Sequence, residues 1–194
     1  MYNPDIHHRK SIRLKQYDYS KEGMYYITIC TQNKECILSE ITKNDNINNV
    51  KNTNDNVGAD SISAQDSITQ SKLNDIGIMV NNIYLDLENQ FINIKLHNYI
   101  IMPNHIHGII EIRERADMES APTTINEIVQ TFKRYTTVEY IKGVKSGIYK
   151  PFDKRIWQRN YYEHVIRNEK ELYRIIKYIQ YNPLNWEMDN IYKK

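Results

Sequence analysis

Two apolar segments separated by only two residues place the strongest constraint on the fold of this chain. Leu96–Met102 and His105–Ile112 have the length and the apolar content of strands. Pro103 and Asn104 between them suit a tight turn rather than a strand interior. Strands joined by so short a turn pair antiparallel. The sequence therefore predicts a β-hairpin near its centre.

Helical patterns lie on both sides of this hairpin. Residues 76–91 repeat apolar side chains at spacings of three and four, which predicts a helix. A second helix is expected to run to about Lys142, with either Thr123 or Thr124 as its N-cap.

A third helix is expected after Asn168. This residue is a favourable N-cap, and Glu171 stands at the third helical position as in a capping box. Because Pro183 disfavours helical geometry at the residue before it, the helix should end near Tyr181.

Met24–Thr31 and Arg159–Arg167 are the remaining predicted strands. The resulting order is strand, helix, strand, strand, helix, strand, helix. This is the split βαβ pattern of an α+β, ferredoxin-like fold: an antiparallel sheet with helices on one face, followed here by a C-terminal helix. We expect a single domain over residues 1–194.

Residues 42–72 have a different composition from the rest of the chain. Eighteen of these 31 residues are Asn, Asp, Ser or Thr, and none is aromatic. Such a segment cannot bury enough apolar surface to offset the entropy lost on ordering. We therefore predict a disordered insertion at 42–72.

Bulk properties exclude several classes of protein. No apolar run approaches the length of a membrane span, and the polar N-terminus lacks the apolar region of a secretory signal. Cys30 and Cys36 are expected to be reduced, which together with these features favours a cytoplasmic protein.

The net charge is only +2, but residues 123–194 carry fourteen Lys and Arg against eight Asp and Glu. Such a basic region is either a solvated surface or a contact for phosphate groups.

The sequence His105-Ile106-His107 is the sharpest chemical signal. Residues two apart in a strand point to the same face, so the two imidazoles should leave the sheet side by side. Imidazole is a common ligand of divalent cations. A lone His-x-His is also compatible with two histidines that bind no metal, so further ligands are needed to choose between these interpretations.

Tyr178 and Asn182 supply such candidates. They stand four residues apart at the end of the last predicted helix and therefore share a face. An amide oxygen suits Mg²⁺ or Mn²⁺, and a tyrosine hydroxyl one turn away would lie close to a phosphate bound there. The structural alternative is a half-buried tyrosine followed by a C-terminal cap.

Taken together, these motifs resemble the single-tyrosine HUH transposases, namely the small insertion-sequence single-strand transposases and, more closely, the REP-associated tyrosine transposases. The resemblance covers nearly all of the chain except residues 42–72. It is carried by segments at 9–14, 26–31, 99–108, 156–164 and 178–183.

The resemblance implies a function and a set of site residues. His105 and His107 would be the metal ligands, Asn182 the third ligand and Tyr178 the nucleophile. The implied reaction is attack of the tyrosine on a phosphate of single-stranded or hairpin DNA, with Mg²⁺ or Mn²⁺ as cofactor. It leaves a 5′-phosphotyrosine and a free 3′-OH that can rejoin another end. The implied protein is a monomer or a homodimer.

Two further clusters are candidate DNA contacts. One interleaves aromatic and basic side chains, a pattern typical of single-strand binding, although its aromatic members could equally belong to the core. Its candidate DNA-binding residues are Trp157, Arg159, Tyr161 and Arg167. The other is an N-terminal basic arm that either contacts DNA or is a solvated tail, and its candidate residues are Arg9, Lys10 and Arg13. His164 is expected to be structural rather than a metal ligand.

Two alternatives to the transposase remain. One is a catalytically silent nucleic-acid-binding domain of the same fold, which would be free to lose the histidines or the tyrosine. The other is an RNA-binding ferredoxin-like domain, which would carry aromatic residues on its central strands where this chain has two histidines.

Overall fold

The main sheet has four antiparallel strands in the order β4-β5-β1-β6. The computed structural model describes residues 22–44, 68–114, 123–189 and 191 of the chain. The strands of the main sheet are β1 (Gly23–Cys30), β4 (Ile94–Ile101), β5 (His105–Ile112) and β6 (Tyr162–Ile166). The predicted central hairpin is β4-β5, and its second strand has the predicted bounds.

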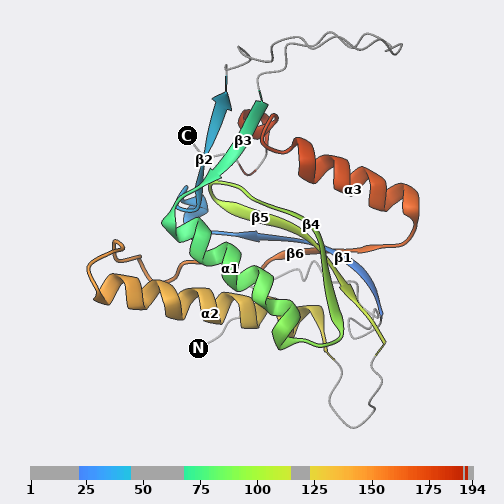
Figure 1. Ribbon diagram of the computed structural model, residues 1–194, viewed down its shortest axis with the longest axis horizontal. Helices are drawn as coiled ribbons and strands as arrows, with labels where there is room; N and C mark the ends of the chain where they lie inside the picture. The colour runs from blue at the N-terminus through green and yellow to red at the C-terminus, as the bar shows by residue number, and fades with distance from the viewer. Residues whose placement is uncertain (1–21, 45–67, 115–122, 190, 192–194) are drawn as a thin grey trace, which may run out of the picture.

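Three helices cover the two faces of this sheet (Figure 1). They are α1 (Asp75–Gln90), α2 (Ile125–Lys145) and α3 (Glu169–Tyr181). α1 and α2 pack on one face, and α3 lies on the other. The α+β, ferredoxin-like prediction is confirmed. Of the three α-helices in the described residues, only α3 lies on the second face of the sheet. None of the described helices is long and apolar enough to cross a membrane.

Each long helix begins at a side-chain cap. The side chains of Asn74, Thr124 and Asn168 accept hydrogen bonds from backbone N–H groups of α1, α2 and α3, respectively. Thr124, and not Thr123, is therefore the cap of α2, and the predicted cap of α3 is confirmed. α3 also ends at Tyr181 as predicted, two residues before Pro183.

Alternation along β1 gives the two faces different chemistry. Tyr25, Ile27 and Ile29 point toward α1 and α2 and are at most 1% exposed. The residues between them, Tyr26 and Thr28, face α3. The same strand thus contributes to an apolar core on one side and to a polar cluster on the other.

A second, two-stranded sheet projects from the main one (Figure 1). It consists of β2 (Ser39–Asn44) and β3 (Ile68–Leu73). The predicted disordered segment is therefore wrong at both ends, where residues 42–44 and 68–72 pair as strands. Backbone pairing does not require an apolar composition, and Ser71 fixes the pair by donating to the carbonyl oxygen of Ile101. Residues 45–67 lie outside the described part of the chain.

Two short 3-10 turns, at Gln32–Lys34 and Trp186–Met188, complete the described structure. The second turn follows α3 and returns the chain toward β5, where the ring of Trp186 lies 5.9 Å from that of His105. This return places the C-terminal segment beside the paired histidines.

Candidate metal centre and tyrosine site

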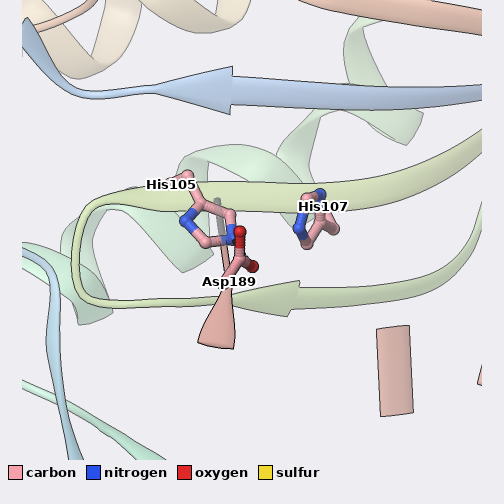
Figure 2. Close-up of side chains that lie close together, drawn as sticks. All are labelled: His105, His107 and Asp189. Carbon is pink, nitrogen blue, oxygen red and sulfur yellow. Dashed lines mark ion pairs between the residues drawn. The ribbon is translucent and has the colours of Figure 1, made fainter. Parts of the chain in front are cut away.

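The two histidines of β5 point to the α3 side of the sheet, side by side. Their ring centroids are 4.4 Å apart, and the side chains are 0% and 1% exposed. Ile106 between them packs into the core on the other side. Figure 2 shows both imidazoles leaving the same strand toward Asp189. The strand alternation expected from His105-Ile106-His107 is confirmed.

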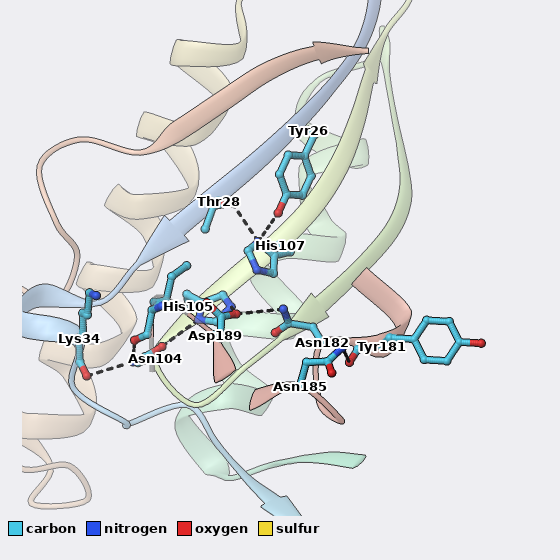
Figure 3. Close-up of polar contacts among 11 residues, drawn as sticks. Tyr26, Thr28, Lys34, Asn104, His105, His107, Tyr181, Asn182, Asn185 and Asp189 are labelled. Carbon is cyan, nitrogen blue, oxygen red and sulfur yellow. Dashed lines mark hydrogen bonds and ion pairs between the residues drawn. The ribbon is translucent and has the colours of Figure 1, made fainter. Parts of the chain in front are cut away.

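Asn104 holds His105 in one orientation. Its amide nitrogen donates to the carbonyl oxygens of Lys34 and Ile191, at 3.2 and 2.9 Å. Its amide oxygen is therefore the acceptor 2.8 Å from Nδ1 of His105 (Figure 3). A proton on Nδ1 leaves Nε2 with a free lone pair directed into the cluster.

His107 is held by two hydroxyl groups of β1. The Tyr26 hydroxyl lies 2.7 Å and Thr28 Oγ1 2.9 Å from its Nδ1 (Figure 3). With its proton on Nδ1, the neutral ring donates to one of these oxygens and again leaves Nε2 free. Such contacts from outside the ligand set fix the orientation of metal-binding histidines.

Asp189 joins the two histidines in a cluster whose candidate ligand atoms all lie within 4.8 Å of one another. Its Oδ2 is 3.9 Å from Nε2 of His105 and accepts from the amide nitrogen of Asn182 at 3.1 Å. Its Oδ1 accepts from the backbone N–H of Ile191 at 2.8 Å. Sequence reasoning missed Asp189, because a single carboxylate beyond the last helix has no spacing that relates it to a strand residue eighty positions earlier.

Three buried polar atoms of this cluster have no hydrogen-bond partner. They are Nε2 of His105, Nε2 of His107 and Oδ1 of Asn182. Buried polar groups are rarely left unpaired, since this costs about 1–3 kcal/mol each. Two imidazole nitrogens, an amide oxygen and a nearby carboxylate form a donor set that a divalent cation would satisfy. The residues therefore fit a metal ion.

The protonation of both rings is compatible with metal binding. Burial lowers the pKa of His105 to about 4, although the carboxylate of Asp189 opposes the shift. Burial, and then the neighbouring His105, hold the pKa of His107 well below its ordinary value. Both imidazoles are thus neutral at pH 7, which is the form that binds a metal.

Tyr178 lies beside this cluster. Its ring centroid is 5.2 Å from that of His107 and 6.4 Å from that of Tyr26, and 47% of the residue is exposed. Burial and then the charge of Asp189 raise the pKa of its hydroxyl, whereas a hydrogen bond from the amide nitrogen of Asn182 lowers it. The structure therefore brings together the four residues predicted as metal ligands and nucleophile, and adds Asp189.

The predicted DNA-binding residues that the structure describes differ in their exposure to solvent. Trp157 is 4% exposed, packs on Phe132 and donates its indole N–H to Thr136 at 2.7 Å. Its ring belongs to the core and is not free to stack on a base. Tyr161 also packs against that core. Both aromatic residues therefore agree with the alternative that they belong to the hydrophobic core, where their rings make apolar contacts.

The basic candidates differ from the aromatic ones. Arg159 and Arg167 are exposed, in the segments before β6 and α3. Arg9, Lys10 and Arg13 lie outside the described residues. His164 is not part of the metal cluster, and its Nε2 lies 2.6 Å from a carboxylate oxygen of Glu171.

The family described as "Transposase IS200 like" matches residues 73–182, which include His105, His107, Tyr178 and Asn182. An uncharacterized protein of Haemophilus influenzae is 38% identical over 98% of this chain and 97% of its own. Another protein of that organism, named provisionally as a REP-associated tyrosine transposase, is 32% identical over 43% of this chain and 46% of its own.

A solved structure of a REP-associated tyrosine transposase bound to a REP hairpin is also similar. It shares 18% identity, with 90% of this chain and 74% of that one covered, and the TM-score is 0.47. A likeness at that level adds nothing to the assignment, which rests on the family match over more than half of the chain. On that match, the chain belongs to the family of IS200-like transposases.

Proposed function

We propose that this protein is a metal-dependent endonuclease of the transposase family that cleaves and rejoins single-stranded or hairpin DNA through Tyr178. The observation that carries the proposal is the position of this half-exposed tyrosine against His107, beside buried ligand atoms without partners. A nucleophile next to an unsatisfied ligand set is what phosphoryl transfer by a tyrosine requires.

The proposed reaction balances without a further co-reactant. The hydroxyl oxygen of Tyr178 attacks the phosphorus, so that a new oxygen–phosphorus bond forms and the bond to the 3′ oxygen breaks. The tyrosine loses its proton, and the leaving 3′ oxygen gains one. The products are a 5′-phosphotyrosine and a free 3′-OH, which can attack the link in the reverse reaction.

His105, His107, Asp189 and Asn182 would hold the cation. When bound, it would supply positive charge to the phosphate oxygens as negative charge develops there. Two imidazole nitrogens favour Mn²⁺ over Mg²⁺, because Mg²⁺ prefers oxygen ligands. Asn104, Tyr26 and Thr28 keep the imidazoles directed into the site.

The substitution Tyr178→Phe removes only the hydroxyl oxygen and tests whether Tyr178 is the nucleophile. Labelled single-stranded and hairpin oligonucleotides are incubated with the full chain and Mn²⁺ or Mg²⁺, and a covalent adduct is sought on a denaturing gel. The parent protein should form the adduct, and Tyr178→Phe should form none, because its ring packs as before but offers no nucleophile.

Tyr181→Phe is the matched control. It lies on the same helix, is 49% exposed and contacts Lys177 rather than the histidines. It should react as the parent does, and a digest of the parent adduct should place the nucleotide on the peptide that contains Tyr178. Adduct formation by Tyr178→Phe would contradict the proposal. DNA binding by the parent without any adduct would favour the catalytically silent binding domain instead.

A further inference from the structure

A groove of about 730 Å³ lies between α3 and the strands β1 and β6. Its lining includes His107, Tyr178 and Asp189 of the proposed catalytic site. The lining also includes residues that this site does not use, among them His164, Glu171 and Arg174.

The groove has a defined direction. Glu171, Arg174 and Tyr178 follow one another along α3 at spacings of three and four, which places them on one face of the helix. His164 lies beside Glu171, so this pair marks the end of the groove near the start of α3. Arg174 therefore stands about one helical turn, roughly 6 Å, from Tyr178 along the groove wall.

Arg174 is the cation in this groove that remains available to a ligand. Glu171, its neighbour at the third preceding position, is engaged by His164 at 2.6 Å and by the backbone N–H of Arg167 at 2.8 Å. Within residues 22–44, 68–114, 123–189 and 191, no carboxylate forms an ion pair with Arg174. The side chain is exposed, and a guanidinium group keeps its charge and binds phosphate oxygens with two parallel hydrogen bonds.

We propose that Arg174 binds a backbone phosphate of the DNA strand next to the phosphate that Tyr178 attacks. The inference rests on the proposed function, because that function places a single strand in the groove. The attacked phosphate occupies the end beside His107 and Asp189, so the strand continues along α3 past Arg174. The contact fixes where the strand lies and does not take part in bond breaking.

Binding of DNA can be measured without cleavage, in the full-length Tyr178→Phe protein with Mn²⁺. The first probe is an oligothymidylate, which forms no hairpin, and fluorescence anisotropy gives its affinity at several salt concentrations. Adding Arg174→Gln should weaken binding about tenfold, as expected for one charged hydrogen-bonded contact. It should also reduce the slope of log affinity against log salt by about 0.7, the value for one phosphate of a single strand.

Arg134→Gln provides the matched control. It makes the same charge change, but Arg134 is on α2, on the opposite face of the sheet, where its guanidinium lies over the ring of Tyr135. It should bind with nearly the parent affinity. Equal effects of the two substitutions would overturn the proposal, because they would show a general charge effect. Circular dichroism of both variants excludes unfolding as the cause.

A second probe locates the contact. In an oligonucleotide that the parent cleaves, single phosphates are replaced one at a time by uncharged methylphosphonates. Neutralising the phosphate bound by Arg174 should weaken binding as much as Arg174→Gln does, and the two changes together should cost no more than one. Independent, multiplicative losses at each phosphate beside the cleavage point would overturn the proposal. A parent that binds oligothymidylate but forms no adduct would contradict the nuclease function alone, and the first probe would still decide whether Arg174 binds phosphate.

Discussion

On the face of the sheet covered by α1 and α2, β1 contributes Tyr25, Ile27 and Ile29 to a continuous hydrophobic core. On the face covered by α3, the same strand contributes Tyr26 and Thr28 to a polar cluster. Neighbouring residues in one strand thus have opposite roles. The comparison indicates that the first face stabilises the fold and that the second carries the candidate site.

The two faces of the sheet also differ in their buried polar atoms that lack a hydrogen-bond partner. On the α3 face, unpaired atoms of His105, His107 and Asn182 converge on Asp189. On the other face, the hydroxyl of Tyr84 is also buried without a partner, but it lies against Gly108, where any side-chain carbon would collide with it. An isolated unpaired atom is a cost of packing, whereas several that converge have the chemistry to hold a metal ion.

Truncating a core aromatic should give the largest effect on stability. Phe132 is 1% exposed and packs against Tyr84 and Trp157, at ring distances of 6.0 and 5.5 Å. Phe132→Ala should lower the free energy of unfolding by about 3–5 kcal/mol, because it leaves a cavity. Urea denaturation measures this loss. The folded fraction of this variant should still be stabilised by Mn²⁺. A loss below about 1 kcal/mol in the free energy of unfolding would show that this face is not the main source of stability.

Removing a histidine should give the next largest effect in the part of the stability that depends on metal. At a concentration a hundred times its dissociation constant, Mn²⁺ should stabilise the parent by about 2.7 kcal/mol, because it binds the folded state. His107→Ala should lose most of this stabilisation, measured by thermal unfolding with and without the ion.

His97→Ala is the control for that measurement. His97 is on β4, contacts Glu111 at 2.9 Å and is not a member of the metal cluster. It should keep the metal-dependent stabilisation of the parent. If His107→Ala responds to Mn²⁺ as strongly as His97→Ala does, the cation does not bind at the cluster of His105, His107 and Asp189.

Most of the core fold could be predicted because each element carries a local signal. The turn at Pro103-Asn104, the cap at Asn168 and the stop before Pro183 each act within a few residues, and all three are where the sequence places them. The β2-β3 pair was not predicted. Its strands contain mainly polar residues, and the hydrogen bond from Ser71 to Ile101 that fixes it joins positions thirty residues apart.

The candidate site, like the fold, could be predicted only where neighbouring residues carry a local pattern. The pairs His105/His107 and Tyr178/Asn182 follow from the periods of a strand and a helix, so their shared faces could be inferred without a structure. Asp189 could not be inferred, because its position depends on how the chain turns back after α3. The burial of Trp157 was equally hidden, since an aromatic residue beside arginines fits either a core or a stacking site.

The smallest predicted effect concerns a half-buried cation on the α1/α2 side, Lys133. The amino group of Lys133 donates to the carbonyl oxygens of Gln158 and Asn160, at 2.9 and 3.2 Å. Burial lowers its pKa to about 8, although the nearby Cys30 opposes the shift. Between pH 8 and about 10.4, the ordinary pKa of lysine, the unfolded chain therefore binds more protons than the folded one. Stability from this group should rise with pH across that window, by roughly 1–2 kcal/mol.

Tyrosines that ionise above pH 9 act in the opposite direction. The quantity to measure is therefore the difference in the free energy of unfolding between the parent and Lys133→Met, obtained from urea unfolding at each pH. That difference should move in favour of the parent as the pH rises, and a difference that stays constant would mean that Lys133 keeps an ordinary pKa despite its burial.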